Sequence, residues 1–235
     1  MKKLIITGLL LAACLFSVSA GDAAVLVDTG FSSDGNVYVF GEYGRTDKSF
    51  QGWAEIYAVN IGKNDFVPGE VFRTKPSAVT AGKSGREVYD ALAGRSYFTT
   101  KKYNCEKTGP DQVLYICGDD EKTGTEEIVF KDFAGVIGDT ATYHIRLIPT
   151  VEGSGTAVKS SFYIMMEKQN ENGEVLSRQK IGSPDVVRKG VTGYKIERIS
   201  CDKSGTSLVF IIEKTMQDST GVLIRYMVEA AKTVK

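Results

Sequence analysis

The sequence predicts a mainly β fold of antiparallel sheets, propeller-like or sandwich-like, with one helix. Most periodic stretches are short, rich in Val, Ile, Tyr, Phe and Thr, and separated by Gly, Asp, Asn and Ser. This alternation is typical of strands joined by turns. Two dipeptides, Asp34-Gly35 and Asn172-Gly173, are typical of hairpins. One stretch has apolar residues at helical spacing, and it predicts the helix.

The strands are expected where β-branched and aromatic residues cluster between turn residues. Strands are predicted over residues 25–29, 36–43, 54–61, 112–117, 127–131, 140–149, 158–168, 174–181, 192–200, 206–214 and 222–229. Two of them contain the segments 37–40 and 208–212, which are apolar on both faces. A strand of this kind needs cover on two sides, so these two are expected to be inner strands.

The turns and the helix complete the expected elements. Asp34-Gly35 and Asn172-Gly173 each offer the pair of positive φ angles that a two-residue hairpin turn requires, so a hairpin is predicted at each. The helix is predicted over residues 84–102, where Val88 and Leu92 share one face. Ser84 stands where a helix N-cap is expected.

The N-terminus, residues 1–20, has the pattern of a signal peptide. Lys2 and Lys3 supply positive charge, and the apolar run 4–13 is too short to span a bilayer. Small residues at Val18-Ser19-Ala20 predict cleavage before Gly21. The alternative is the lipobox 11–14, which would place a lipid on Cys14. The protein is therefore expected to be periplasmic or secreted, or else lipid-anchored through Cys14, with residues 21–235 as a single mainly β domain.

The net charge of the chain bears on which class of partner is expected. The chain has 29 basic and 29 acidic residues, and removal of Lys2 and Lys3 leaves a net charge of −2 on the mature protein. A nucleic-acid partner is not expected, because such a partner favours a basic surface. The sequence after the signal peptide holds no apolar run long enough for a transmembrane segment.

Three cysteines remain after cleavage at Ala20: Cys105, Cys117 and Cys201. In an oxidising compartment, Cys105 and Cys117 are the nearest pair and the predicted disulfide, worth roughly 3 kcal/mol from chain entropy. The alternative is that the thiols are buried as small apolar groups. No metal site is expected, because metal-ligand spacings such as Cys-x-x-Cys are absent from the sequence and it has one histidine.

The two ends of the mature chain share a pattern. Phe40 follows Gly35 by five positions, and Phe210 follows Gly205 by the same spacing. Each unit, residues 31–61 and 199–229, reads as a turn, a strand, a connection and a second strand. We expect the two units to fold alike, to lie close together and to pair into a common sheet, which would hide exposed edges.

Two resemblances follow from these residues. Phe-Ser-x-Asp-Gly at 31–35, the aromatic Phe40 and the strand 55–60 resemble one blade of a TolB-like β-propeller. The whole chain, with its signal peptide, the segment 149–155 and the closing strand 224–229, resembles a family of predicted secreted bacterial proteins of unknown function. This second resemblance implies secretion and brings no activity with it.

Candidate chemical sites have simpler explanations. His144 shares a strand face with Thr142 and Arg146, which indicates a solvated face.

The segment 82–84 matches the end of a phosphate-binding loop motif. Ser77, however, stands where the first glycine of that motif would be, so a turn followed by a helix cap is expected. The acidic run 119–127 has Phe130 where a calcium loop needs Glu, so a solvated hairpin is expected. We predict no catalytic residue, no cofactor site and no metal site.

Aromatic residues offer one further surface. Tyr43, Phe50 and Trp53 flank the connection 45–51, which is a candidate for a contact surface.

The leading functional hypothesis is a non-catalytic binding or scaffold protein of the periplasm, whose partner is an envelope protein or a cell-wall component. The alternative is a carboxylate-dependent cell-wall hydrolase, because Asp and Glu can act without a histidine. A cleft with two carboxylates roughly 5 to 10 Å apart, one with a raised pKa, would favour the alternative.

Overall fold

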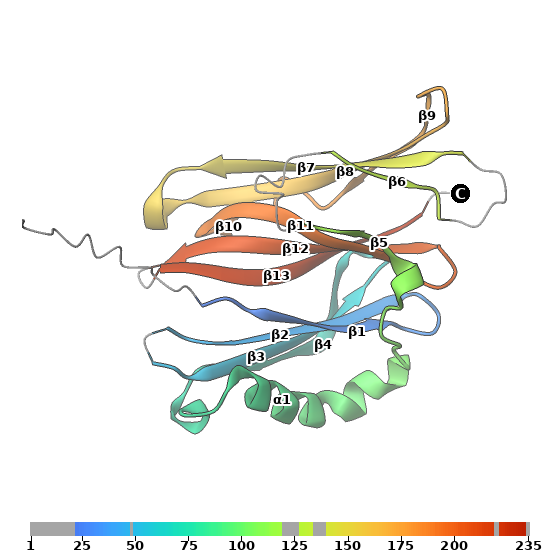
Figure 1. Cartoon of the computed structure of the whole chain (residues 1–235). Coiled ribbons are helices and arrows are strands. Elements are labelled where there is room, and N and C mark those ends of the chain that lie inside the picture. The colour runs from blue at the N-terminus through green and yellow to red at the C-terminus, as the bar shows by residue number, and fades with distance from the viewer. Residues whose placement is uncertain (1–21, 48, 119–126, 134–139, 219–220, 234–235) are drawn as a thin grey trace, which may run out of the picture.

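The computed structural model describes residues 22–47, 49–118, 127–133, 140–218 and 221–233. In this part the chain forms three antiparallel sheets and one α-helix, stacked in layers (Figure 1). Helix α1 (Gly85–Thr100) covers the outer face of the first sheet. We call the three the N-terminal, central and outer sheets, and the central sheet lies between the other two.

Each sheet has a simple strand order. The N-terminal sheet runs β1 (Val25–Phe31), β2 (Val37–Arg45), β3 (Gly52–Asn60), β4 (Asp65–Thr74). The central sheet runs β13 (Gly221–Lys232), β12 (Ser207–Asp218), β11 (Val191–Cys201), β5 (Val113–Ile116). The outer sheet runs β10 (Arg188–Lys189), β8 (Lys159–Gln169), β7 (Thr142–Glu152), β6 (Ile128–Lys131), and β9 (Val175–Ile181) also pairs with β8. Short 3₁₀ helices are η1 (Ala78–Thr80), η2 (Lys101–Tyr103), η3 (Pro110–Gln112) and η4 (Gly155–Ala157).

The prediction of a mainly β fold with antiparallel sheets and one α-helix is confirmed, and each predicted strand is present within a few residues. Two strands were missed. Strand β4 contains Pro68-Gly69, a pair that argues against a central strand and is tolerated here because β4 is an edge strand. Strand β10 has only two residues, too few for a periodic pattern.

Helix α1 begins as predicted. Ser84 Oγ accepts the backbone N–H of Glu87 at 3.2 Å, and the Glu87 carboxylate accepts the backbone N–H of Ser84 at 2.7 Å. This reciprocal capping box satisfies two donors at the helix start. The apolar face of the helix, with Val88 and Leu92, packs against the N-terminal sheet.

The central sheet has an apolar core on both faces. Leu208, Phe210 and Ile212 of β12 pack toward the outer sheet, whereas Val209 and Ile211 pack toward the N-terminal sheet. All five are fully buried. Residues 37–40 of β2 are buried as well, so the prediction of two inner strands is confirmed.

The two repeated units are alike and close together, as predicted. In each turn one side-chain oxygen accepts two successive backbone N–H groups: Ser32 Oγ from residues 36 and 37, and Asp202 Oδ1 from residues 206 and 207. The expected common sheet is wrong, because β2 belongs to the N-terminal sheet and β12 to the central sheet. The units join face to face through a shared apolar cluster, because β2 and β12 each pair with a strand on both sides and have no free edge.

The hairpins at Asp34-Gly35 and Asn172-Gly173 are present, but the predicted two-residue turns are wrong. In each dipeptide only the glycine has a positive φ, +64° for Gly35 and +79° for Gly173. Residues 33–36 separate Ser32 from Val37, which are hydrogen-bonded, and residues 171–173 separate Asn170 from Glu174. These longer loops need one left-handed residue rather than two.

Helix length bears on membrane insertion. Among the described residues, none of the helices is both long and apolar enough to cross a bilayer.

Candidate functional site

A groove lies where the three sheets meet. Its volume is about 730 Å³, within the usual size range of small-ligand sites. One wall is the turn between β3 and β4, the other is β9 with the segment that leads to β10, and the floor is residues 227–232 of β13. Because the walls come from different sheets, the groove exists only in the folded stack.

The floor strand, β13, is an edge strand of the central sheet, and its open side is closed by this chain's own groups. The N–H of Tyr226 donates to Glu42 Oε2 at 2.8 Å, and the N–H of Ala230 donates to Asn64 Oδ1 at 2.6 Å. Farther along, Ile224 exchanges backbone hydrogen bonds with the segment 22–24. Such covering of an edge protects it from pairing with another chain.

Asn64 links the edge of β13 to a buried carboxylate in the groove. Its Nδ2 donates to the carboxylate of Glu229, and Arg188 Nη2 lies 3.6 Å from the other oxygen of that group. The guanidinium of Arg188 is itself held over the Phe162 ring at 4.9 Å. Burial raises the pKa of Glu229, while the Asn64 hydrogen bond and the charge of Arg188 act in the opposite direction. The carboxylate is therefore a partnered group.

The walls of the groove are partly apolar and exposed. The Phe66 side chain is 42% exposed and its ring stacks on Tyr57 at 5.2 Å between centroids. Val186, on the opposite wall, is 50% exposed. Lys63 is exposed at the rim. The ammonium of Lys180 lies on the outward face of the outer sheet, 4.6 Å from the centroid of Tyr163. The groove thus combines apolar contact area with positive charge.

Gln179 lines the wall that β9 forms. Its Oε1 is buried and accepts no hydrogen bond from any residue that the structure describes. A buried acceptor without a donor is unfavourable, but this oxygen has less than 1 Å² of accessible surface, so a ligand in the groove does not reach it.

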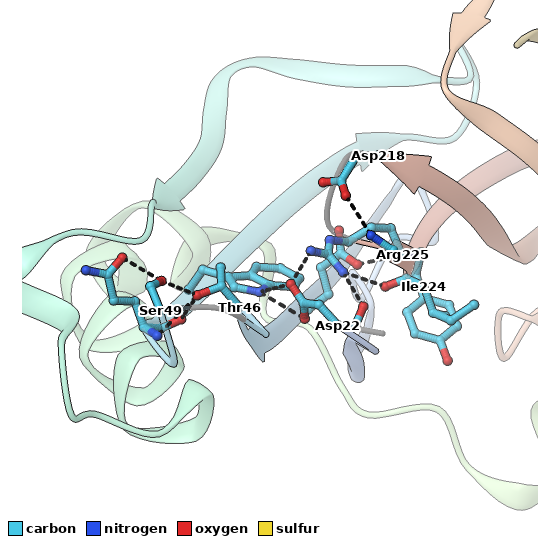
Figure 2. A network of polar contacts seen from close by, with 11 residues as sticks. Asp22, Thr46, Ser49, Asp218, Ile224 and Arg225 are labelled. Atoms are coloured by element: carbon cyan, nitrogen blue, oxygen red, sulfur yellow. Dashed lines mark hydrogen bonds and ion pairs between the residues drawn. The ribbon is translucent and has the colours of Figure 1, made fainter. Parts of the chain in front are cut away.

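A second polar cluster fastens the start of the described chain to β13 (Figure 2). Arg225 Nη2 donates to Asp22 Oδ2 at 2.6 Å, and its Nη1 donates to the backbone oxygens of Asp22 and Ile224 at 2.8 Å. The Arg225 guanidinium stacks on Trp53 at 4.1 Å, and Trp53 Nε1 donates to Asp22 Oδ2 at 3.0 Å. All of these groups satisfy one another, which indicates a structural role.

Glu42 lies between these two clusters and is only 2% exposed. Burial raises its pKa to about 7, opposed by the hydrogen bond from Tyr226 and the charge of Lys214. Glu55 stands directly opposite Glu42 in the sheet register, and its negative charge raises the Glu42 pKa further. Two glutamates are therefore adjacent, but Glu42 is buried and already caps the edge of β13.

A smaller hollow, of about 400 Å³, lies between the two repeated turns. Its carboxylates serve their own turns: hydrogen bonds from Ser32 and Asn36 lower the pKa of Asp34 to about 2, and Asp202 accepts backbone N–H groups of its turn. We therefore regard the groove beside β13 as the candidate site.

The predicted disulfide partners lie in different layers. Cys105 packs against the cluster beneath helix α1, whereas Cys117 follows β5 of the central sheet, and its backbone N–H donates to Glu197 O. Cys105 and Cys201 are free thiols in this structure, and burial raises the pKa of each to about 11. The bridge is not formed here and stays a prediction.

The other residues considered from the sequence lie away from the groove. His144 is on the predicted strand face with Thr142 and Arg146, and its Nδ1 is 3.3 Å from Glu127. Phe50, in the connection 45–51, is exposed, whereas Trp53, in β3, is buried, so these two residues do not form a common exposed face. Residues 1–20, with Cys14, and most of the acidic run, 119–126, lie outside the described residues. No group of three or more His, Cys, Asp or Glu in the described chain is placed to hold a metal.

Sequence reasoning missed the groove. The wall formed by residues 61–66 depends on β4, which was not predicted. The floor depends on which strand lies at the edge of the central sheet. One signal was available: Glu42 and Glu229 each follow a run of mostly apolar residues, and a charge that such a strand buries requires a partner. The partners, Asn64 and the N–H of Tyr226, are distant in sequence.

Comparison with known proteins gives the family. A family model with the description "Predicted secreted protein (DUF2259)" matches residues 39–232. The chain belongs to this family. The match spans every strand that forms the groove, and it leaves the TolB-like resemblance of the end units unconfirmed. No curated protein and no solved structure matches the chain.

Proposed function

We propose that this secreted protein is a non-catalytic binding protein of the bacterial periplasm that holds an envelope ligand in the groove beside β13. The observation that carries the proposal is the pairing of exposed apolar walls, Phe66 and Val186, with a carboxylate, Glu229, that is already partnered. Such a surface offers contact area and orientation rather than a reactive group.

The alternative, a carboxylate-dependent cell-wall hydrolase, needs two carboxyl groups about 5 to 10 Å apart, one of them an acid with a raised pKa. One observation favours it: Glu42 has a raised pKa and stands opposite Glu55. However, the Glu42 carboxylate is buried and accepts the N–H of Tyr226. Glu229 accepts a hydrogen bond from Asn64, which also caps the N–H of Ala230 on the same strand edge. The raised pKa values of Glu42 and Glu229 therefore both belong to groups that close the edge of β13.

Binding is tested with fluorescently labelled mature protein, residues 21–235, and a washed envelope fraction of the bacterium that exports it. We expect saturable co-sedimentation. Phe66→Ala should weaken it about fivefold to tenfold, because loss of an aromatic contact costs about 1 to 1.4 kcal/mol at such a surface. Phe50→Ala is the matched control: Phe50 is 63% exposed but lies at the opposite end of β3. Equal binding by both variants would contradict the use of the groove.

Catalysis is tested on purified cell-wall sacculi by the release of soluble fragments. We expect release no greater than from sacculi in buffer. Release that Glu42→Gln abolishes would support the hydrolase and contradict the binding proposal. Thermal unfolding of that variant serves as the folding control.

A further inference from the structure

We infer that the outward face of the outer sheet binds the surface of an anionic phospholipid bilayer. This inference goes beyond the proposed function, because the groove beside β13 lies between the sheets. Three features of the outward face carry it: no described layer covers the face, basic side chains outnumber acidic ones on it, and apolar side chains lie among the charges.

The outward face is defined by the alternation of side chains along each strand. Ile145 of β7 and Ile164 of β8 are buried in the core shared with the central sheet, so their neighbours in sequence point the other way. The outer sheet lies at one end of the stack of layers (Figure 1), and no other element of the described chain lies over this face. The face is therefore open to a partner.

Basic side chains dominate the outward face. Six described basic side chains lie on it, namely Lys131, Arg146, Lys159, Arg178, Lys180 and Lys189, against three acidic ones, Glu127, Glu152 and Glu167. The mature chain as a whole has a net charge of −2, so positive charge is concentrated on one side of the molecule. Such an excess attracts a negatively charged surface.

The acidic groups on this face are already shared between basic ones. The Glu167 side chain belongs to a buried residue, with Arg178 Nε at 2.8 Å and Arg146 Nη2 at 3.4 Å from the same carboxylate oxygen. Glu127 lies at the β6 edge of the face, where its carboxylate is 3.3 Å from His144 and 3.8 Å from Arg146. The three acidic groups therefore leave the face with a net positive charge.

Two lysines oppose each other at the other edge of the sheet. Lys159 and Lys189 are register partners in β8 and β10, and both side chains are exposed. Like charges directly opposite each other destabilise a sheet. Glu152, the partner of Lys159 in β7, supplies one negative charge for the two ammonium groups. An external anion would offset the remaining repulsion, so this edge points to a negatively charged partner.

Apolar side chains lie among these charges. The ammonium of Lys180 lies 4.6 Å from the centroid of Tyr163. Met165 stands between Lys180 and Arg146 in the register of β9, β8 and β7, and Val129 of β6 is 51% exposed. Tyrosine and basic residues are both favoured at the boundary between lipid and water. An open face that bears both suits a bilayer surface, whereas a small ligand needs an enclosing pocket.

The test is co-sedimentation of the mature protein, residues 21–235, with phospholipid vesicles. We expect binding to mixed vesicles of phosphatidylglycerol and phosphatidylcholine, and no binding to vesicles of phosphatidylcholine alone. Binding should be lost when the salt concentration is raised from about 0.1 M to about 1 M, because the Debye length falls from about 10 Å to about 3 Å. Equal binding to both kinds of vesicle, or binding to neither, would overturn the inference.

Charge variants test the face directly. Lys159→Gln with Lys189→Gln should weaken binding to the mixed vesicles about fivefold for each charge removed, since a basic residue near an anionic membrane is worth about 1 kcal/mol. The matched control, Lys75→Gln with Lys83→Gln, removes two exposed lysines beside β4 and helix α1 and should bind like the natural protein. Glu152→Gln removes an acidic group from the face and should strengthen binding.

Thermal unfolding of each variant checks that the fold is kept. Equal weakening by the two double variants would overturn the assignment to the outward face. An acidic polysaccharide is the rival partner, with soluble alginate as the probe. Binding to alginate that depends on Lys159 and Lys189, without binding to vesicles, would overturn the bilayer as the partner.

One more variant separates this inference from the proposed function. Phe66→Ala should bind the mixed vesicles like the natural protein, because Phe66 lines the groove and is not part of the outward face. Loss of vesicle binding in that variant would assign the membrane contact to the groove and overturn the inference. Absence of vesicle binding in the natural protein would overturn the inference alone, since the groove is tested separately with Phe66→Ala on the envelope fraction.

Discussion

Ser207 Oγ donates a hydrogen bond to the backbone oxygen of Gly35 at 2.7 Å, across 172 positions of sequence. Lys232 Nζ donates to the same oxygen at 2.9 Å. The contact joins the two repeated turns, one from the N-terminal sheet and one from the central sheet. The start and the end of the domain are therefore held together by polar groups as well as by the apolar cluster between the sheets.

The Asp202 turn should contribute strongly to stability. Asp202→Ala removes the acceptor for the N–H groups of Thr206 and Ser207, so we expect the free energy of unfolding to fall by about 2 to 3 kcal/mol. Denaturant unfolding measures it, with Asp185→Ala in an exposed loop as the control. A loss equal to that of the control would contradict the role of this turn.

Gly35 should not tolerate a side chain. Its φ is +64°, and a Cβ there would lie 2.6 Å from Asp202 Oδ2. Gly35→Ala should therefore cost about 2 kcal/mol or more, from backbone strain and from the displaced turn. Gly173→Ala is the control, because it shares the positive φ but has open space around it. If Gly35→Ala and Gly173→Ala lower the midpoint of thermal unfolding equally, the contact with Asp202 is unimportant.

Stability should fall as pH rises from about 4.5 to 7 because of Glu42. Burial raises the Glu42 pKa in the folded state from 4.5 to about 7, so the folded protein binds more protons than the unfolded chain in this window. The contribution is fully present below the unfolded value and lost above pH 7. The contribution is about 3.4 kcal/mol at most, at 1.36 kcal/mol per pKa unit.

Glu42→Gln removes this titration while keeping an oxygen for the N–H of Tyr226. We expect its unfolding free energy between pH 5 and pH 8 to vary less than that of the natural protein. Glu152→Gln, at the exposed end of β7, should keep the full dependence. Identical pH profiles for Glu42→Gln and the natural protein would disprove the assignment.

Asn64 should protect the edge of β13. Asn64→Asp keeps a residue that tolerates the observed φ of +50° but places a second carboxylate beside Glu229. Repulsion should lower the midpoint of thermal unfolding and expose the N–H of Ala230. We expect concentration-dependent self-association by light scattering near pH 7. Asn172→Asp, in an exposed hairpin, should remain monomer-like in the same assay; association by both variants would contradict the edge-closing role.

The cysteines and the N-terminus can be checked on freshly exported protein. We expect peptide mapping without reductant to find Cys105 joined to Cys117, and intact mass to place the first residue at Gly21. Alkylatable thiols at both cysteines would rule out the bridge. A diacylglyceryl group on Cys14 would show that the lipobox is used.

The sequence by itself determined the local structure. Ser84 with Glu87 specified the helix start, alternation specified the strands, and the apolar segments at 37–40 and 208–212 identified the buried strands, because each signal acts between neighbours in the chain. Gly35 and Gly205 at equal spacing from Phe40 and Phe210 likewise predicted two similar units.

Only the tertiary structure decided how those units meet and where the groove beside β13 forms. Strand alternation specifies which residues are buried but not which sheet covers them, so the two units pack face to face instead of sharing a sheet. The groove is built by Asn64, Arg188 and Glu229, which are distant in sequence and are brought together by three different sheets. A site of this kind leaves no local pattern, because its geometry comes from the order in which the layers stack.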